Sequence, residues 1–330
     1  MAESRRPNNE PRRPLGQTGL LVSPVALGCW PIAGVTTLGA NEADSLATLR
    51  AALDSGINHL DTAFVYGGNG ESERLIARAI SGRRDQAVIA TKGGVHFEGD
   101  QMQQDARPAT LRAECEESLR RLGTDRVELL YLHSPDPAVA VEESAGALRD
   151  LQAEGKTLSV GASNCSLEQL QAFHAVCPLA AVQLPYNMLQ RGIEKKTLPW
   201  CRANGVSVMN YWPLMKGLLA GKLPQDGKLD PRDSRRKYPM YQGQEWEKNL
   251  RFVARLQEAA ALSGHTVAQL VVNWTMNQPG ITSVLCGAKR DWQIQETSGA
   301  MGWRPSGEQT RLIDQALESR GLAEANREFE

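Results

Sequence analysis

The sequence predicts one (β/α)8 barrel of the TIM-barrel class, and two observations carry this prediction. Short apolar runs rich in β-branched residues alternate eight times with amphipathic helical stretches. No GxGxxG motif follows the first run, and no change of composition marks a second domain, so a doubly wound sheet is disfavoured. Because barrels of about 250 residues often fold as one unit, we assign residues 14–330 to one domain, preceded by a flexible tail over residues 1–13.

The eight apolar runs predict strands that are buried on both faces, as parallel strands are. They span residues 25–29, 58–62, 87–91, 127–133, 158–163, 181–186, 206–211 and 281–287. Several of the helical stretches between them end on a glycine, the residue that a left-handed C-terminal cap prefers. These glycines are Gly56, Gly123, Gly155, Gly205 and Gly264.

Three segments lie outside this alternation. Residues 12–23 predict a short hairpin with a glycine turn that closes the bottom of the barrel, and residues 309–321 predict an extra C-terminal helix. Residues 224–245 form a long polar loop after the seventh strand, and such loops in compact domains are usually lids or binding loops. Its basic residues Arg232 and Arg235 are interpreted either as solvated charges or as a cover for a bound phosphate.

Composition limits the partners and the compartment. Lys and Arg number 37 against 38 Asp and Glu, which does not favour a nucleic acid or an anionic membrane as partner. The chain has neither a signal-peptide apolar segment nor a run of 18 apolar residues. Its six cysteines form no CxxC pair and no zinc spacing, so we expect reduced thiols, no metal site and a cytoplasmic location. The expected partner is a small molecule, and the oligomeric state stays open.

Four titratable side chains follow three successive predicted strands. Asp61 ends the second strand and Tyr66 follows it, Lys92 ends the third strand, and His133 ends the fourth. The carboxyl ends of barrel strands meet at one rim, where the active sites of such barrels lie. Each residue by itself is more often structural, but four together on one rim favour catalysis.

These four residues suit the protonation of a carbonyl oxygen. A phenol has a pKa of about 10 and needs a nearby cation to act as an acid at neutral pH. Lys92 supplies that charge, Asp61 holds Lys92 by a charge-assisted hydrogen bond, and His133 donates to the substrate oxygen. Tyr66 is therefore the predicted general acid.

A protonated carbonyl also needs a hydride, which no protein side chain supplies, so a cofactor must bind at the same rim. Polar groups at the later strand ends provide candidate contacts. Ser163, Asn164 and Gln183 have the donors and acceptors that a carboxamide needs, and Tyr211 offers a flat face to a nicotinamide ring.

The segment after the eighth strand suits a phosphate. Gly287 lets the backbone approach closely, and Lys289 or Arg290 places positive charge at a helix start. The acidic residue that holds the ribose of NADH in doubly wound folds has no counterpart here, which favours NADPH and its 2′-phosphate.

The motifs that contain these residues resemble the aldo-keto reductase superfamily. They are HLDTAFVYG, IATKGG, YLHSPDP, VGASNCS, VQLPYN and YWPLMKGLLAGK, and the similarity extends from LGQTGLLVSPVALGCW to GAKRDWQIQE. The pattern is closest to the branch of bacterial general reductases and potassium-channel β subunits. The resemblance implies NADPH-dependent reduction of aldehydes or ketones, with Asp61, Tyr66, Lys92 and His133 as the catalytic tetrad and Tyr66 as the acid.

The resemblance also implies where NADP(H) binds. The carboxamide would be held by Ser163, Asn164 and Gln183, and Tyr211 would stack on the nicotinamide. The pyrophosphate would follow residues 212–217 and Lys222, and the adenosine end would lie after the eighth strand, with Lys289 favoured at the 2′-phosphate. The implied contacts are Cys29, Trp30, Asp61, Ser163, Asn164, Gln183, Tyr211, Trp212, Pro213, Leu214, Lys216, Gly217, Lys222, Gly287, Lys289, Gln293, Glu296 and Thr297.

The substrate and two alternative functions complete the predictions. Trp30, Phe64 and His96, with Phe97, lie on loops after the first three strands, where they either form an aromatic pocket for apolar carbonyls or only pack the loops. A lysine at a barrel strand end can also form a Schiff base, so Lys92 is compatible with a lyase. The second alternative is a cofactor-sensing regulatory subunit with vestigial catalysis.

Overall fold

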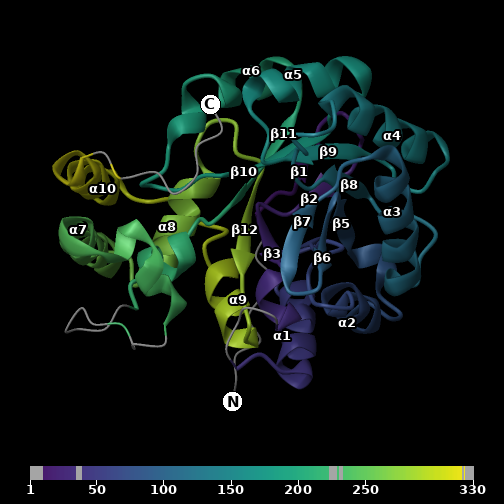
Figure 1. Cartoon of the computed structure of the whole chain (residues 1–330). Coiled ribbons are helices and arrows are strands. Elements are labelled where there is room, and N and C mark those ends of the chain that lie inside the picture. Colours follow the sequence, from purple (N-terminus) through teal and green to yellow (C-terminus); the bar gives the residue numbers. More distant parts are fainter. Residues whose placement is uncertain (1–9, 35–38, 223–228, 230–232, 322, 324–330) are drawn as a thin grey trace.

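Eight parallel strands close into a barrel in the computed structural model, which describes residues 10–34, 39–222, 229, 233–321 and 323 (Figure 1). The barrel strands are β3 (Val25–Gly28), β4 (His59–Asp61), β5 (Val88–Gly93), β8 (Leu129–Leu132), β9 (Val160–Ser163), β10 (Ala181–Pro185), β11 (Ser207–Tyr211) and β12 (Ser283–Gly287). Because β12 pairs with β3, the sheet has no free edge. Each strand lies within the range that the sequence predicts or overlaps it, so the predicted fold class is confirmed.

Helices surround the barrel (Figure 1). The α-helices are α1 (Glu42–Asp54), α2 (Glu71–Ala79), α3 (Pro108–Leu122), α4 (Val141–Ala153), α5 (Leu167–Val176), α6 (Thr197–Ala203), α7 (Gly243–Ala261), α8 (Val267–Met276), α9 (Asp291–Ser298) and α10 (Gly307–Arg320). Short 3-10 helices are η1 (Trp30–Ala33), η2 (Arg84–Gln86), η3 (Gly192–Glu194), η4 (Met215–Ala220), η5 (Ser234–Lys237) and η6 (Pro239–Tyr241). The five glycines predicted to end helices all have positive φ, as expected of C-terminal caps. None of the described helices has the length and apolar character needed to cross a membrane.

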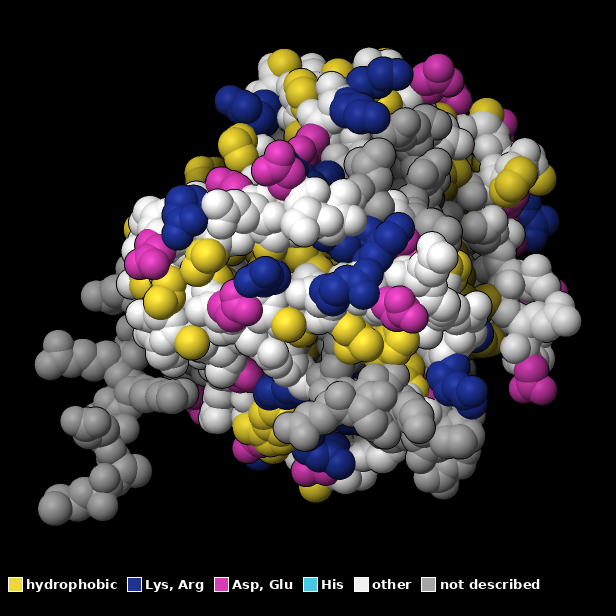
Figure 2. All heavy atoms as spheres, turned by 90° about the vertical axis from the view of Figure 1, so that its left-hand side faces the viewer, with side chains coloured by type: hydrophobic (Ala, Val, Ile, Leu, Met, Phe, Trp, Pro, Cys, Tyr) yellow, Lys and Arg dark blue, Asp and Glu magenta, His cyan; other side chains and the backbone are white. Residues whose placement is uncertain are grey.

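The helices α7 and α10 lie side by side at the left of Figure 1 and form a second core with α8. Phe252 and Leu256 of α7 are buried together with Val271 of α8 and Ile313 of α10. The surface of this side carries basic side chains interspersed with acidic ones (Figure 2). The predicted extra helix therefore packs on the outside of the barrel through α7 and α8.

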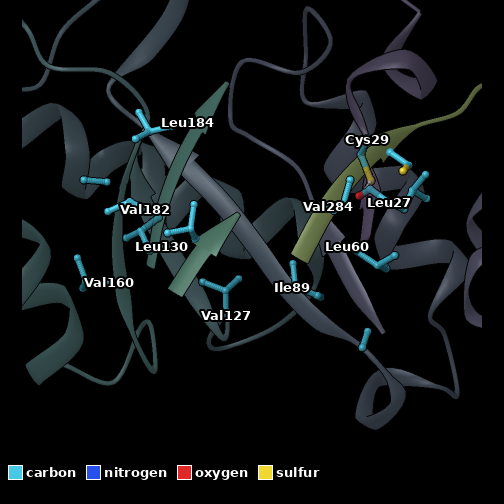
Figure 3. Packing of buried hydrophobic residues seen from close by; sticks show 14 of the residues in the cluster. Leu27, Cys29, Leu60, Ile89, Val127, Leu130, Val160, Val182, Leu184 and Val284 are labelled. Carbon is cyan, nitrogen blue, oxygen red and sulfur yellow. Dashed lines mark hydrogen bonds between the residues drawn. The ribbon is translucent and has the colours of Figure 1, made fainter. Parts of the chain in front are cut away.

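The two faces of the barrel strands have different surroundings. Outward residues such as Leu60, Ile89 and Val284 belong to the large core between strands and helices (Figure 3). Inward residues, among them Ala90 and Tyr131, form a separate cluster in the barrel interior. Because side chains alternate along a strand, this arrangement directs the polar residues at the upper strand ends toward the mouth of the barrel.

The N-terminal hairpin closes the bottom of the barrel, as the sequence predicts. Strands β1 (Arg13–Pro14) and β2 (Leu21–Val22) pair antiparallel, and Leu15 and Val22 belong to the interior cluster. The Arg13 guanidinium donates to the carbonyl oxygens of Met276 at 2.6 Å and Ile281 at 3.0 Å. It thereby satisfies carbonyl groups that the end of α8 and the following turn leave open.

The last residues of the segment predicted as a flexible tail, residues 1–13, make contacts with the rest of the chain. Arg13 belongs to β1, and the Glu10 carboxylate forms an ion pair of 3.0 Å with Arg304 and accepts from the Gly302 amide. These contacts hold the segment against the C-terminal half of the chain. Residues 1–9 lie outside the described residues.

Two loop segments contain structure that the sequence analysis did not predict. After β5, strands β6 (Val95–Glu98) and β7 (Gln101–Gln104) form an antiparallel hairpin around Gly99 and Asp100, with φ of 60° at Gly99. A Gly-Asp pair between two strands is a hairpin signal. The predicted loop 224–245 contains η5 and η6, and α7 begins within it at Gly243. Arg232 lies outside the described residues.

The ring of Tyr131 fills the barrel interior because the neighbouring strand carries a glycine. A Cβ atom on Gly161 would lie 2.4 Å from Cε1 of Tyr131 and 2.9 Å from the Ala181 carbonyl oxygen. Neither the ring nor the backbone can move easily in a packed barrel.

We expect Gly161→Ala to lower the free energy of unfolding by about 1–3 kcal/mol, the usual cost of overpacking a core. Urea unfolding followed by circular dichroism measures this difference. Gly146→Ala is the matched control, because Gly146 lies within α4 and no atom lies within 4 Å of its added Cβ. The control should be neutral or up to about 1 kcal/mol more stable, and an equal loss in both variants would contradict the steric explanation.

His59 is also buried in the barrel, two residues before Asp61 on β4. Within the described part of the chain neither of its ring nitrogens has a hydrogen-bond partner. Burial therefore lowers the pKa of His59 from 6.5 to about 4, although the nearby Asp61 charge acts in the opposite direction. The folded chain holds His59 neutral.

A histidine with a lowered pKa stabilises the fold above its unfolded pKa, and this stabilisation is lost as the pH falls toward the folded value. With pKa values of 6.5 and about 4, wild type should lose about 2 kcal/mol more than His59→Leu between pH 8 and pH 5. Urea unfolding of both proteins at the two pH values measures the difference. Equal pH dependence of the two would contradict the neutral state of His59.

Candidate active site

The ammonium group of Lys92 is the centre of the polar rim. Its Nζ lies 2.7 Å from Oδ1 of Asp61, 2.7 Å from the Thr62 carbonyl oxygen and 3.5 Å from the hydroxyl of Tyr66. Burial is the largest influence and by itself would lower the pKa of Lys92, but Asp61 and Tyr66 together outweigh it and the pKa is raised. Lys92 is therefore a permanent cation beside the phenol.

Asp61 is buried at the carboxyl end of β4, with donors on both of its oxygen atoms. Lys92 donates to Oδ1, and Nε2 of Gln183 on β10 donates to Oδ2 at 2.7 Å. A buried carboxylate is stable only when it is paired and hydrogen-bonded. The structure thus joins Asp61, Lys92 and Tyr66 as the sequence predicts, and adds Gln183.

Tyr66 lies in the loop after β4, at the mouth of the barrel. Burial raises the pKa of its phenol, while the Lys92 charge acts to lower it. The sequence prediction considered the cation and omitted burial, which is the larger influence. The phenol is consequently protonated at neutral pH and can donate.

The loop of Tyr66 is anchored from the outer helices. Arg121 of α3 donates to the Phe64 carbonyl at 3.0 Å and forms an ion pair of 3.2 Å with the fully buried Glu73 of α2. Glu73 also accepts from the hydroxyl of Thr91 on β5 at 2.7 Å. These three residues, which the sequence analysis missed, connect the acid's loop to the strand that carries Lys92.

His133 and Trp30 lie on either side of the phenol. The ring centroids of Tyr66 and His133 are 5.9 Å apart, and those of Tyr66 and Trp30 are 4.9 Å apart in an edge-to-face arrangement. The backbone amide of His133 donates to the Gly93 carbonyl at 2.8 Å, which fixes its position beside β5. All four predicted catalytic residues therefore meet at one rim.

The residues predicted to bind a carboxamide are connected by hydrogen bonds. The Ser163 hydroxyl donates to the Gln183 backbone carbonyl at 2.9 Å, and the side-chain amide of Asn164 donates to the His133 backbone carbonyl at 2.9 Å. The Tyr211 hydroxyl donates to Oδ1 of Asn164 at 2.8 Å. This network holds the polar side chains next to the tetrad.

Backbone strain in the described residues is concentrated in the same region. The non-glycine residues with positive φ are Asn164, Trp212, Met215 and Lys216, with φ between 46° and 59°. Three of them are predicted cofactor contacts, and Met215 lies between two others. Such conformations cost energy and are concentrated at functional sites.

The segment after β11 folds under the described part of the long loop. Nη1 of Arg235 lies 3.5 Å from the Lys216 carbonyl oxygen, and Nη2 donates to Oδ2 of Asp233 at 2.6 Å. Tyr241 donates from its hydroxyl to the same carbonyl at 3.1 Å. Gly217 leaves room for this packing, because an added Cβ would lie 3.2 Å from the Arg235 guanidinium. Arg235 therefore lies beside the predicted pyrophosphate segment.

An ion pair connects the predicted pyrophosphate and adenosine segments. Lys222 lies 2.6 Å from the Glu296 carboxylate of α9, and its ammonium lies 4.5 Å from the centre of the Trp292 ring. Trp292 is about half exposed. The two segments are thus joined in this structure.

Lys289 and Arg290 differ in their surroundings. Arg290 forms an ion pair of 3.0 Å with Asp44 of α1 and donates to the Gly39 carbonyl at 2.9 Å. The Lys289 amide donates to the side chain of Gln293 at 2.9 Å, which caps the start of α9. Arg290 thus fastens α9 to α1.

Other predicted residues have their side chains engaged elsewhere. The thiol of Cys29 is fully buried against the Leu27 carbonyl, and the Thr297 hydroxyl is bonded to carbonyls of its own helix. Phe64 packs under the Arg121 guanidinium at 4.2 Å, and Nδ1 of His96 lies 2.8 Å from the buried Glu114 carboxylate. Trp30 is the predicted pocket residue that directly contacts Tyr66.

Comparisons with known proteins agree with this geometry. The model of the aldo/keto reductase family matches residues 24–318. Aldo-keto reductase YhdN of Bacillus subtilis is 37% identical over 308 residues, which cover 92% of this chain and 93% of that protein. Probable aldo-keto reductase 1 of Glycine max is 30% identical over 305 residues, which cover 92% of this chain and 88% of that protein.

A solved structure is similar over nearly the whole chain. The glycerol dehydrogenase AKR11B4 from Gluconobacter oxydans superimposes with a TM-score of 0.87 at 34% identity, covering 97% of this chain and 99% of that one. The barrel, the tetrad at its rim and the family match agree. The chain belongs to the aldo/keto reductase family and is an oxidoreductase.

Proposed function

We propose that this protein reduces aldehydes or ketones to alcohols with NADPH, and that Tyr66 is the general acid. The observation that carries the proposal is the Lys92 ammonium, held by buried Asp61 within 3.5 Å of the Tyr66 hydroxyl. This arrangement can place a proton on a carbonyl oxygen at the mouth of the barrel.

The chain's own residues have separate tasks in this reaction. Tyr66 donates its proton to the carbonyl oxygen as negative charge develops there, and Lys92 stabilises the phenolate that remains. Asp61 and the Thr62 carbonyl keep the ammonium in place. His133 lies close enough to Tyr66 to give a second donor to the same oxygen. The reduced nicotinamide, when bound, supplies the hydride to the carbonyl carbon.

The rim fits a nicotinamide cofactor in two respects. Ser163, Asn164 and Gln183 supply amide and hydroxyl groups beside the tetrad, and Tyr211 supplies a ring next to them. The strained backbone at Met215 and Lys216 is followed by Gly217, also with positive φ. The Met215 and Gly217 amides donate to the Trp212 and Leu214 carbonyls within this turn, and strained backbone of this kind is concentrated at ligand-binding segments.

The substrate class follows from the pocket wall. Trp30 packs edge-to-face on Tyr66 beside the reacting position, and an aromatic wall suits apolar or aromatic carbonyl compounds. An aromatic aldehyde is therefore the first substrate to test.

The two alternatives are less consistent with the site. A Schiff-base lysine needs a lowered pKa, whereas the pKa of Lys92 is raised because Asp61 and Tyr66 together outweigh burial. Borohydride trapping of a substrate on Lys92 would support the lyase. A cofactor-sensing subunit should turn over well below about 1 s⁻¹, the low end of ordinary enzymes.

We expect Tyr66→Phe to lower turnover by about 10²–10⁴-fold, because it removes the proton donor and keeps the ring. NADPH binding should barely change. Steady-state loss of the reduced-nicotinamide absorbance with an aromatic aldehyde measures turnover, and tryptophan fluorescence measures binding. A variant that keeps more than half of its turnover would remove Tyr66 from the acid role.

Lys92→Met is the companion variant, with folding checked by circular dichroism. If Tyr66 and Lys92 act as a unit, the turnover of the Tyr66→Phe, Lys92→Met double variant should be scarcely lower than that of either single variant. Additive losses would show that they act independently.

We expect wild type to bind NADPH at least about tenfold more tightly than NADH, since a hydrogen bond to a charged group contributes about 1.5–3 kcal/mol. Lys289→Ala should remove most of this difference by weakening NADPH alone. Fluorescence titration with each cofactor measures both affinities.

Arg290→Ala is the matched control, because Arg290 is already bonded to Asp44 and Gly39. This variant should keep the preference for NADPH. Equal affinity of wild type for the two cofactors would contradict the proposed cofactor, and a loss confined to the Arg290 variant would move the phosphate contact to that residue.

A further inference from the structure

The Asp61 carboxylate is held from opposite sides of the barrel. Lys92 donates to Oδ1 from the adjacent strand β5, and Gln183 donates to Oδ2 from β10, each at 2.7 Å. In the closed order of strands, β10 lies four places from β4, which is directly across an eight-stranded barrel. The bond from Gln183 therefore spans the barrel interior.

The direction of the Gln183 amide follows from the chemistry of its partner. An ionised carboxylate can only accept hydrogen bonds, so the NH₂ group of Gln183 must face Asp61 and its oxygen must face away. Gln183 and Asp61 are 3% and 2% exposed, so water replaces this donor poorly. Among the described residues each oxygen of Asp61 has one side-chain donor.

The surroundings hold the strand that carries Gln183 in place. Tyr131 fills the interior at the level of Lys92, its ring 6.0 Å from Nζ and packed against Gly161. The Ser163 hydroxyl and the Asn164 backbone amide both donate to the Gln183 backbone carbonyl oxygen, at 2.9 and 3.3 Å. The backbone of Gln183 is thus fixed, and its side chain reaches Asp61 from a rigid strand.

We propose that Gln183 is a positioning residue of the acid site, which holds the Asp61 carboxylate in the orientation that keeps the Lys92 ammonium beside the Tyr66 hydroxyl. This inference rests on the proposed function for the role of Tyr66, and it adds to the expected contact of Gln183 with the cofactor. Without the Gln183 donor, Asp61 is free to turn and to draw Lys92 away from the phenol.

The effect on Tyr66 has a defined direction. The ionisable groups around its hydroxyl are Lys92, Asp61, Cys29 and His133. Among them Lys92 lowers the pKa of Tyr66 and Asp61 raises it. Loss of the Gln183 bond leaves Asp61 less neutralised and Lys92 farther from the phenol, so the pKa of Tyr66 must rise.

Gln183→Met tests this role, because it keeps the length of the side chain and removes the amide. The titration of Tyr66 is followed by NMR of protein labelled with ¹³C at the phenol carbon of tyrosine, with Tyr66→Phe identifying the signal. No substrate or cofactor is needed. We expect the pKa of Tyr66 to rise by about one unit, and kcat with an aromatic aldehyde to fall by about tenfold while the alkaline limb of its pH profile moves upward.

Two further variants separate positioning from cofactor binding. Ser163→Ala is the matched control, since the Ser163 hydroxyl bonds to the Gln183 carbonyl and not to its side chain, and the Asn164 backbone amide still bonds to that carbonyl; it should weaken NADPH binding without moving the Tyr66 titration. In an Asp61→Asn background, Gln183→Met should cause no further shift, because the partner of its bond is altered. Gln183→Asn, one methylene too short to reach Asp61, replaces the methionine variant if that variant fails to fold.

The outcomes are distinct. An unchanged Tyr66 titration in the Gln183 variant, with weaker NADPH binding as in Ser163→Ala, would overturn the proposal and leave Gln183 as a cofactor contact only. If wild type reduces no carbonyl compound, the proposed function fails, while the titration still decides whether Gln183 positions the Lys92 ammonium.

Discussion

The buried ion pair between Asp61 and Lys92 is the interaction on which the rest of the site depends. Two opposite charges lie 2.7 Å apart with their side chains 3% and 1% exposed. Removing one partner of such a pair typically costs about 3–5 kcal/mol, so the adjacent strands β4 and β5 must keep their register for the fold as well as for the chemistry. The pair also fixes the Lys92 ammonium beside the Tyr66 phenol.

Much of this architecture could be predicted from the sequence because a barrel converts position along the chain into position in space. Eight apolar runs give eight strands, and the last residue of each strand lies at one rim. Asp61 ends β4, Lys92 is the last residue but one of β5, and His133 directly follows β8. No distance had to be known to bring these three side chains together, because the closed sheet fixes which strand ends are neighbours.

Contacts between distant parts of the chain could not be predicted in the same way. The bond from Gln183 to Asp61 joins residues 122 positions apart, and the bond from Arg121 to Phe64 joins residues 57 apart. Both depend on side-chain direction, about which the sequence pattern says nothing. The burial of the Cys29 thiol also depends on the direction of its side chain and could not be predicted. The hairpin around Gly99 is different, since its Gly-Asp turn was present in the sequence and was overlooked.

The pKa of Tyr66 shows that the sequence supplies only part of the physical reason for the state of a side chain. The sequence supplies the cation that lowers the pKa, but the depth of burial that raises it is a property of the folded chain. The phenol is therefore kept protonated by burial, and in the proposed reaction Lys92 acts chiefly after the proton has left, when it faces the phenolate.

The left-handed backbone at Asn164, Trp212, Met215 and Lys216 has a consequence for how such a chain can change over time. Glycine would adopt these conformations without strain, so a chain selected for stability alone would drift toward glycine at these positions. Non-glycine residues are retained at these positions only if their side chains serve a function. In a descendant that keeps the barrel but no longer binds a ligand, these residues would be the first to be replaced by glycine. Their presence therefore indicates whether the rim still binds a ligand.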